Sequence, residues 1–467
     1  MIETRATSRT HPRWCCFSLF VIVTTLMIGP VISVAAQEVP NSAPNPTPQP
    51  AARNSIDTAT PISLNDAIEL ALRQASPYAA AQINQKIASE DVRQARAAFL
   101  PKVTAPLTLI YTTPSLNRTT PREPSFLGAN AITEYQGLVN AAGEIDTSGR
   151  LTAALRRGRA LVESARAGSE VARRELVQSV VDAYFNLALS TTKRRGAESN
   201  LRAAVEFENN TRLQLEAGEV APVDLVRARL QTAARRDELA QAATDEAVNG
   251  DALRGLIAMD FSQPIVTTDL LTQTPSPDEI QRFSEATISS RPEFAQFEAE
   301  RHAAEFEAKA ARAERLPQLT YSVSSGFITD SLTPVPIKDH LGVQATIGFT
   351  IPIFDWGASR SREAQARLRT RLAENSKQLS QRQFVQAFHT ARTQALAAQD
   401  RIAMLNLSIT DAESNVNASL ARYRAGEAAI VEVVDAQNLL VTQRQALYQA
   451  LFDYQTAKSR LARAAGQ

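Results

Sequence analysis

The sequence predicts a mainly α-helical protein made of two related halves, with a small amount of β-structure at equivalent places in each half. Three observations lead there: the composition, a pair of matching turns, and two very long stretches without proline. Of the 467 residues, 44% are hydrophobic but only 6% are aromatic, and Ala, Leu, Arg, Gln and Glu dominate long stretches. This composition is typical of long helices rather than of a compact enzyme.

Charge and cysteine content argue against several classes of function. The 50 basic and 49 acidic residues leave a formal net charge of +1, so there is no general electrostatic reason to expect nucleic acid as a partner. The only cysteines are Cys15 and Cys16, and the four histidines are scattered. We therefore expect no metal site, no cofactor and no disulfide. Without a Ser/His/Asp order, an HExxH motif or a phosphate-binding glycine loop, we also predict that the protein is not an enzyme.

The first 36 residues have the features of a signal peptide. A basic segment precedes an apolar run over 17–28, and small residues stand at 34–36. An uncleaved membrane anchor is the alternative, and the shortness of the run disfavours it. Residues 37–61 are rich in proline, which predicts an extended, disordered linker. Later apolar runs fall short of the roughly 20 residues of a membrane-spanning helix, so entry into a membrane would require β-strands closed into a barrel.

The two halves of the chain repeat one another. The turn Ala217-Gly218-Glu219 is matched by Ala425-Gly426-Glu427, and Gly149 and Gly357 stand at the same distance before these turns. Each glycine is followed by a proline-free stretch of roughly 68 residues, which as a helix would be about 100 Å long. Such a length does not suit a compact domain.

Shorter helical segments complete a four-membered array. Two helical segments are expected to return from the two turns, over 222–259 and 429–465. Each corresponds to about 55 Å of helix. Those at 77–99 and 292–316 add roughly 35–38 Å each. A short helix stacked end to end on a returning helix nearly matches the length of one long helix. The sequence therefore predicts two continuous helices and two made of coaxial pieces.

The last helix carries a seven-residue repeat typical of a coiled coil. One series of positions is mainly large and apolar, and a second, three residues later, is mainly alanine: Val433, Leu440, Leu447, Tyr454 and Leu461, then Ala436, Gln443, Ala450, Ala457 and Ala464. Small residues in such a seam let neighbouring helices approach closely. An ordinary two- or three-stranded coiled coil is the alternative, and periodicity alone does not exclude it.

Four candidate strands lie between the helices, over 103–111, 131–141, 319–327 and 341–353. They alternate apolar and small polar residues, and Glu134 is their only formally charged residue. This length and pattern are typical of transmembrane β-strands, and four aromatic residues are placed to form an interfacial girdle: Tyr111, Tyr135, Phe354 and Trp356. A small soluble β-subdomain is the alternative. Four strands cannot close a barrel alone, but three protomers would supply twelve strands and twelve helix positions.

From residue 62 to residue 466 the chain resembles the TolC-like outer-membrane efflux protein family. The resemblance is carried by four motifs in order: Ile62-Ser63-Leu64-Asn65-Asp66-Ala67-Ile68, Phe99-Leu100-Pro101, Ile351-Pro352-Ile353-Phe354-Asp355-Trp356-Gly357, and Tyr423-Arg424-Ala425-Gly426 followed by Val433-Val434-Asp435-Ala436-Gln437. It implies a homotrimeric channel-tunnel in the outer membrane of a Gram-negative-type bacterium, extending into the periplasm. Each protomer would give four β-strands to a shared 12-stranded transmembrane β-barrel, continuous with an α-barrel of long coiled-coil-like helices.

The resemblance also implies a function and partners. The protein would be the passive exit duct of a tripartite efflux or type I secretion system, surrounded by outer-membrane lipid. A periplasmic adaptor (membrane fusion protein) would couple it to an inner-membrane pump of the RND, ABC or MFS type. The alternative is a periplasmic coiled-coil scaffold or adaptor protein that never enters the membrane. The sequence does not identify the transported substrate.

This interpretation divides the chain into eight segments. They are a signal peptide (1–36), a Pro-rich linker (37–61), periplasmic helices of the first repeat (62–101), a first pair of outer-membrane strands (102–148), a first helical hairpin (149–270), periplasmic helices of the second repeat (271–317), a second pair of strands (318–356) and a second helical hairpin (357–467). The first exit from the strands lacks the Pro and Phe of the second, so we expect the two exits to differ in shape.

The resemblance assigns residues to a periplasmic gate. Acidic rings narrow the mouth in this family, and Glu432 and Asp435 occupy those positions; three copies of each would attract cations. Solvated acids at a helix start are the simpler interpretation. Asp224 and Tyr423 match positions that latch the closed mouth. The best-known form of the latch also uses a basic residue where this chain has Ala428, and Arg424 or Arg227 would have to replace it. The turns at Gly218, Glu219, Gly426 and Glu427 match adaptor-docking tips.

Overall fold

The computed structural model describes residues 60–112, 133–268, 271, 275–276 and 278–466. The predicted signal peptide and residues 37–59 of the predicted linker lie outside the described residues, as does the start of the second predicted strand. Thr60 and Pro61, the predicted end of the linker, belong instead to a short strand, β1 (Thr60–Ile62), which pairs in parallel with β5 (Ile265–Thr267).

Two helices of 67 residues dominate the fold, α3 (Arg150–Glu216) and α8 (Ala358–Arg424). Both follow the prediction to within one residue, because a glycine in the left-handed conformation stands at each start. At their far ends, Gly218 and Gly426 have φ values of 76° and 75°. In the first turn Glu219 N donates to Gln214 O and Gly218 N to Leu215 O, and the second turn repeats the arrangement. Each long helix therefore ends in a Schellman motif, which uses the glycine to satisfy the last carbonyls.

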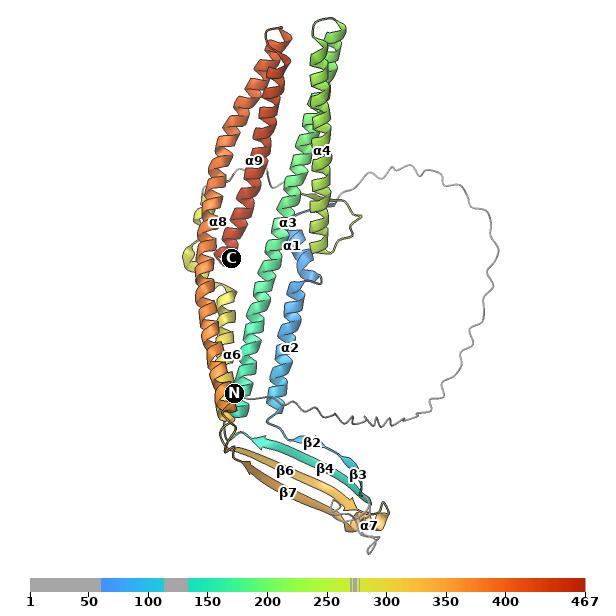
Figure 1. Ribbon diagram of the computed structural model, residues 1–467, viewed down its shortest axis with the longest axis vertical. Helices are drawn as coiled ribbons and strands as arrows, with labels where there is room; N and C mark the ends of the chain where they lie inside the picture. The colour runs from blue at the N-terminus through green and yellow to red at the C-terminus, as the bar shows by residue number, and fades with distance from the viewer. Residues whose placement is uncertain (1–59, 113–132, 269–270, 272–274, 277, 467) are drawn as a thin grey trace, which may run out of the picture. The chain divides into compact units, whose positions relative to one another are not determined.

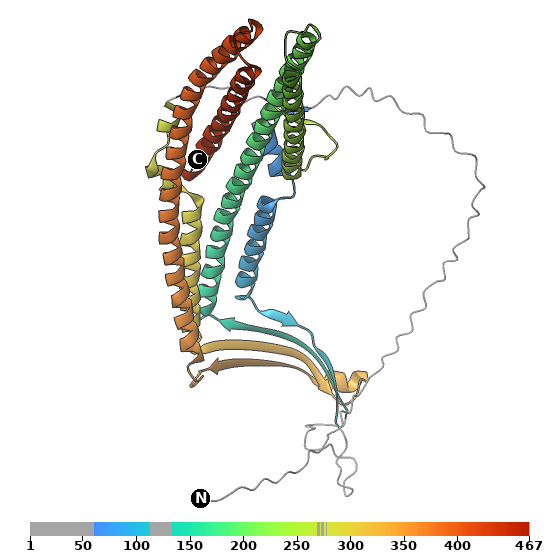
Figure 2. The ribbon, with the colours of Figure 1, turned by 45° about the horizontal axis from the view of Figure 1, so that its top comes forward.

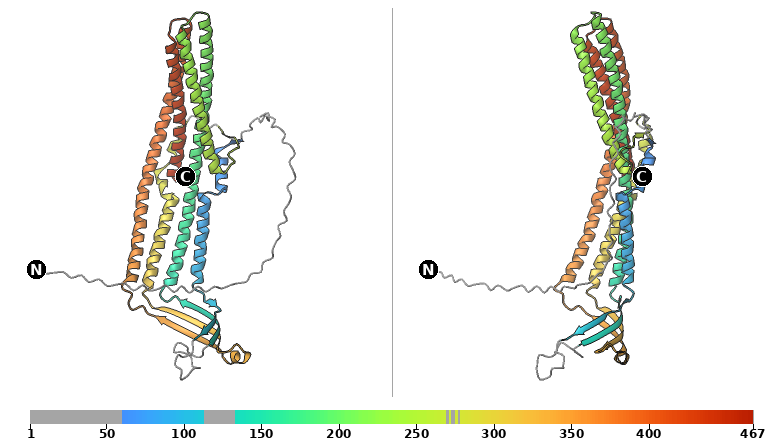
Figure 3. Two further views of the ribbon diagram at one scale, coloured as in Figure 1. Left: turned by 45° about the vertical axis from the view of Figure 1, so that its right-hand side comes forward. Right: turned by 90° about the vertical axis from the view of Figure 1, so that its right-hand side faces the viewer.

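Four shorter helices pack along these two. The returning helices are α4 (Pro222–Ile257) and α9 (Ile430–Ala464), and the sheet-proximal ones are α2 (Pro77–Ala97) and α6 (Pro292–Ala313). On one side of α3 lie α2 and then α4, at successive levels; between α3 and α8 lie α6 and then α9 (Figures 1 and 3). The predicted array of two continuous and two composite helices is therefore present.

Burial follows the predicted seam of the last helix. Val433, Tyr454 and Leu461 are buried, as are four alanines of the accompanying series: Ala436, Ala450, Ala457 and Ala464. The short elements around the middle of the array had no individual prediction. They are α1 (Leu64–Arg73), which begins with a Ser63–Asp66 capping box, α5 (Asp278–Gln281) and a 3-10 helix (Glu285–Ser290). In the described part of the chain, none of the helices has both the length and the apolar character that crossing a bilayer would demand.

The remaining strands form one antiparallel sheet at the end of the helices (Figure 2). Its members are β2 (Lys102–Thr104), β3 (Leu107–Tyr111), β4 (Thr133–Ile145), β6 (Gln318–Thr329) and β7 (Leu341–Thr350), with a short helix α7 (Pro334–Asp339) between the last two. β2 and β3 both pair with β4, so the first predicted strand is interrupted at Ala105-Pro106. Because proline has no N–H, only its carbonyl bonds to β4, accepting from Leu138 N at 3.1 Å.

Candidate functional site: the two-faced sheet and the hairpin tips

The register of the sheet places apolar side chains on one face. Leu109 lies opposite Tyr135, Tyr321 opposite Ile347, and Leu319 opposite Phe349. Directly opposed residues of an antiparallel pair point to the same side. The same face therefore carries a continuous set across all strands: Val103, Leu107, Leu109, Tyr111, Tyr135, Val139, Ile145, Leu319, Tyr321, Val323, Phe327, Leu341, Val343, Ile347 and Phe349.

The opposite face is mainly polar. β4 contributes Gln136, Asn140 and Glu144 to this face, at every fourth position. β6 presents Thr320, Ser322 and Ser324 to the same side. Ser324 Oγ donates to Asn140 Oδ1 at 3.2 Å, and Gln136 Nε2 donates to Glu134 Oε1 at 2.5 Å. A sheet with this division is suited to separating an apolar phase from water.

The apolar face is exposed. Val343 and Ile347 of β7 are 74% and 78% exposed within the chain, and Leu107 of β3 is 86% exposed. Large contiguous apolar surfaces of this kind mark interaction with a membrane or another protein.

Two glycines of β4 allow aromatic rings to lie across the apolar face. A Cβ at Gly137 would stand 2.6 Å from Phe327 Cε1, and one at Gly143 would stand 2.6 Å from Tyr321 Oη. The rings of β6 therefore occupy the space above the two glycines. This packing fixes the register of β4 against β6.

Both lateral edges of the sheet lack a strand partner among the described residues. β7 pairs only with β6, and β2 and β3 pair only with β4. An edge strand leaves a row of backbone N–H and C=O groups available to another strand. The sheet is thus open on two sides.

The four predicted girdle residues lie at the two ends of the sheet. Tyr111 and Tyr135 are on β3 and β4, near the end remote from the helices. Phe354 and Trp356 follow β7 at the helix end, with ring centroids 4.7 Å apart, and Trp356 is 90% exposed. The girdle itself stays a prediction.

An aspartate caps each long helix where it leaves the sheet, and neither residue was predicted to be a cap. Asp146 accepts from Leu151 N at 2.9 Å and Thr152 N at 2.8 Å, and Asp355 accepts from Ser359 N at 2.8 Å. The sequence signal that would have found them is an Asp two or three residues before a Gly, with a Ser or Thr two or three residues after that Gly. The two connections from the sheet to the long helices therefore differ in sequence but cap their helices in the same way.

At the far end of the array, Arg422 and Glu432 form an ion pair across the second hairpin. Glu432 is half-buried, whereas Asp435, one turn further along α9, is exposed and has no ion pair in the part of the chain described. Both acids were predicted from the sequence, whereas Arg422 was not. The two carboxylates thus differ in how much of their charge is already compensated.

The two predicted latch residues lie near one another. Tyr423 is buried, and its ring centroid is 5.9 Å from that of Phe207 on α3. Burial raises the pKa of Tyr423, with a smaller contribution from the negative charge of Asp224 on α4, while the Thr211 hydroxyl acts in the opposite direction. Tyr423 therefore joins the two hairpins in one small core with Ile430 and Val433.

Of the two basic residues expected to replace the missing latch residue, Arg227 pairs with Asp224 on its own helix at 3.7 Å. Arg424 is exposed and forms no ion pair among the described residues. The turn residues Gly218, Glu219, Gly426 and Glu427 are all exposed at the tips of the hairpins. Their docking role stays a prediction.

Comparison with known proteins agrees with this architecture. A family model described as "Outer membrane efflux protein" matches residues 67–258 and 284–467. Among curated relatives, Protein CyaE of Bordetella pertussis is 26% identical over 87% of this chain and 83% of its own length, and the outer membrane efflux protein BepC of Brucella suis is 24% identical over 87% and 85%. Among solved structures, the CmeC outer membrane channel of Campylobacter jejuni has the same fold, with a TM-score of 0.78 at 17% identity over 86% of this chain and 85% of that one. Because the family model covers most of both repeats, the chain belongs to the outer membrane efflux protein family and is a protein of the outer membrane.

Proposed function

We propose that the protein is a passive, homotrimeric exit duct for efflux or secretion. Each protomer gives its four-stranded sheet, with β2 and β3 together as one strand, to a shared 12-stranded barrel. The helical layers form a continuous α-barrel that crosses the periplasm. An adaptor couples the duct to an inner-membrane pump, which supplies the energy, and the duct itself performs no chemical reaction.

The two-faced, open-edged sheet is the observation that carries this proposal. In lipid every backbone polar group has to be satisfied within the protein, so an open sheet has to close with other strands. With the apolar face towards lipid, the polar face lines an aqueous lumen. A periplasmic scaffold, the alternative function, would leave the apolar face in water and the two edges unpaired.

The hairpin tips support the periplasmic part of the proposal. They stand at the end of the array away from the sheet (Figure 1). We assign the exposed turns to adaptor docking, and the acids Glu432 and Asp435 to the constriction at the mouth. The contact of Tyr423 with Phe207 holds the two hairpins of one protomer together in the closed state.

Substitutions on opposite faces of one strand test the proposal. Val343→Arg with Ile347→Arg places charge on the apolar face, and the matched variant Gln344→Arg with Thr346→Arg places the same charge on the polar face. Charge towards lipid is unfavourable by about 2–4 kcal/mol per residue at mid-membrane. We expect only the first variant to lose insertion into liposomes and conductance in planar bilayers.

Native mass spectrometry of the detergent-purified wild type provides the second measurement, with a trimer expected. Equal insertion and conductance of the two double variants would overturn the assignment of the faces. A monomeric, non-conducting wild type would overturn the duct and favour the periplasmic scaffold.

A further inference from the structure

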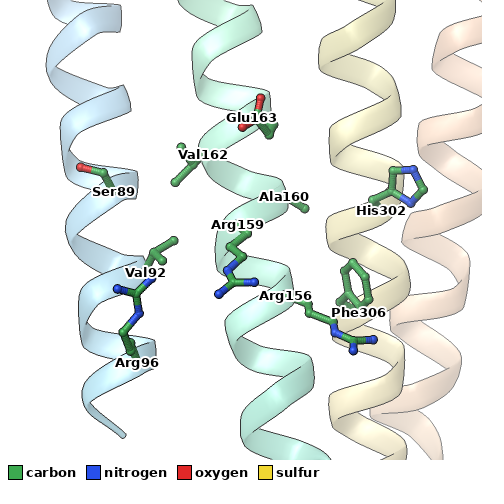
Figure 4. Close-up of a pocket in the computed structure, with 10 residues that line it drawn as sticks. All are labelled: Ser89, Val92, Arg96, Arg156, Arg159, Ala160, Val162, Glu163, His302 and Phe306. Atoms are coloured by element: carbon green, nitrogen blue, oxygen red, sulfur yellow. The ribbon is translucent and has the colours of Figure 1, made fainter. Parts of the chain in front are cut away.

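A groove crosses α2, α3 and α6 near the sheet, and its lining combines arginines with apolar side chains. Its volume is about 660 Å³. Arg96 comes from α2, and Arg156 and Arg159 come from α3; the apolar part is Val92, Ala160, Val162 and Phe306. Figure 4 shows Arg96 and Arg159 at the same height on the two neighbouring helices, and Arg156 beside Phe306. Such a lining suits a molecule that is both anionic and apolar.

The three arginines are not neutralised by the protein. None of them has an ion pair among the described residues, although many other arginines of the helices do. Arg156 lies with its guanidinium carbon 6.0 Å from the centre of the Phe306 ring. One carboxylate, Glu163, lines the groove. His302 also lines it, and its ring nitrogens lie 3.6 Å from a carboxylate oxygen of Glu298 and 3.3 Å from one of Glu305. The guanidinium groups thus keep most of their donors for a ligand.

The groove lies next to the sheet along the helix axes. α2 ends at Ala97, five residues before β2, and α3 begins five residues after Ile145 at the end of β4. At 1.5 Å per residue, Arg156 and Arg159 are about 9 and 14 Å along α3 from its first turn. At this junction Ile353, Phe354 and Trp356 are exposed. Arginine side chains are long enough to extend from this level towards the boundary of an apolar phase.

The groove opens on the side of the apolar face of the sheet. Glu144 belongs to the polar face, and it accepts from Arg150 Nε at 3.3 Å, which places Arg150 on that side of α3. Arg159 follows Arg150 by nine residues, which is two and a half helical turns. Arg159 therefore lies on the opposite side of the helix, facing the surroundings rather than the proposed lumen.

We propose that this groove binds the headgroup of an anionic phospholipid of the outer membrane. Arg96, Arg156 and Arg159 hold the phosphate through charge-assisted hydrogen bonds, and the apolar floor receives the first part of the acyl chains. This inference rests on the proposed function, because it needs the sheet to lie in the bilayer. The bound lipid fixes how deep each protomer sits in the membrane.

Lipid retention measured by native mass spectrometry tests the inference. The purified trimer is titrated with palmitoyl-oleoyl phosphatidylglycerol and, separately, with the zwitterionic phosphatidylcholine of the same chains. The variant Arg96→Gln/Arg156→Gln/Arg159→Gln is compared with Arg382→Gln/Arg392→Gln/Arg401→Gln. The latter removes the same charge from three exposed arginines further along α8 that have no ion pair among the described residues.

We expect wild type and the α8 variant to retain phosphatidylglycerol in preference to phosphatidylcholine, and the groove variant to bind it roughly 100-fold more weakly. If the triple variant yields no trimer, the single variant Arg159→Gln replaces it in the same measurement. We expect it to weaken binding roughly fivefold. Equal retention of the two lipids, or no loss in the groove variants, overturns the inference. So does displacement of the lipid by inorganic phosphate at equal concentration, which would identify a site for the free anion.

Bilayer conductance of the same samples separates the two proposals. Wild type that conducts without preferring phosphatidylglycerol contradicts the lipid site alone. Wild type that neither inserts nor conducts contradicts the duct, whatever lipid it retains.

Discussion

Arg422 and Glu432 form an ion pair across the tip of the second hairpin, joining the last turn of α8 to the first turn of α9. Their side chains are 52% and 41% exposed, so solvent screening keeps the contribution of the pair to stability small. Its effect on the local charge is larger, because Glu432 already faces a cation whereas the carboxylate of Asp435 does not. The two acids proposed for the mouth should therefore contribute unequally to ion selectivity.

We predict that Asp435→Asn reduces the cation selectivity of the channel more than Glu432→Gln does, and that the double substitution to alanine reduces it most. Arg422→Gln should raise selectivity, because it frees the charge of Glu432. Reversal potentials in planar bilayers under a salt gradient provide the measurement. Asp411→Asn, an exposed acid of α8 away from the tip, is the matched control. Selectivity that responds equally to Asp411→Asn and Asp435→Asn would rule out a ring at the mouth.

A second prediction concerns the turns. Gly218→Ala and Gly426→Ala should each destabilise the protein by about 1 kcal/mol, because a Cβ is unfavourable at the left-handed conformation that ends each long helix. The control is Gly255→Ala in the last turn of α4, where a Cβ meets nothing within 4 Å; it should be neutral or stabilising. Thermal melting followed by circular dichroism compares the three. Equal melting temperatures for Gly255→Ala and the turn variants would show that these glycines serve another purpose.

The glycines under the aromatic rings give a third prediction. Gly137→Ala should lower stability by about 1–3 kcal/mol, since Phe327 has to leave its place on the apolar face. Gly342→Ala on β7, where a Cβ meets nothing within 4 Å, is the control. Resistance of the proposed trimer to dissociation on heating in detergent is the measurement. Full resistance in Gly137→Ala would mean that the ring does not fix the register.

A fourth prediction concerns pH. Hydrogen bonds from Arg301 and, across to α8, from Lys377 lower the pKa of Glu298 to about 2, from an ordinary value of 4.5. Because the folded-state pKa is depressed, the stabilisation is present above about pH 4.5 and is lost as the pH falls from there towards 2. Glu298→Gln should therefore lower the melting temperature at pH 7 but little at pH 2. A difference between variant and wild type that is the same at both pH values would contradict this linkage.

Much of the fold could be predicted because the residues that start and end the long helices are recognisable from local sequence. Gly149 and Gly218 bound α3, and Gly357 and Gly426 bound α8, so the ends of the long helices are readable within one residue. The parallel pair β1–β5 is different: each strand has three residues, and its position depends on Tyr184 of α3, whose hydroxyl bonds to Ile62 O and Thr268 O. No local pattern encodes such a contact.

The candidate site was predictable in its residue types but not in its contacts. Alternation along the strands identified the two faces, since it has the period of the pleat. The packing of Phe327 over Gly137 depends on the register between strands far apart in the chain, which alternation does not fix. Likewise, Glu432 and Asp435 were identified as a pair, while the cation that distinguishes them, Arg422, becomes a neighbour only when the hairpin closes.

The open edges of the sheet have a consequence for how the protein reaches its folded state. On the proposed closure, the last backbone hydrogen bonds of β7 and of β2 and β3 form only between copies, so a single protomer has no way to complete its sheet in lipid. Folding and assembly then become one reaction, whose yield depends on how many protomers arrive at the same patch of membrane together.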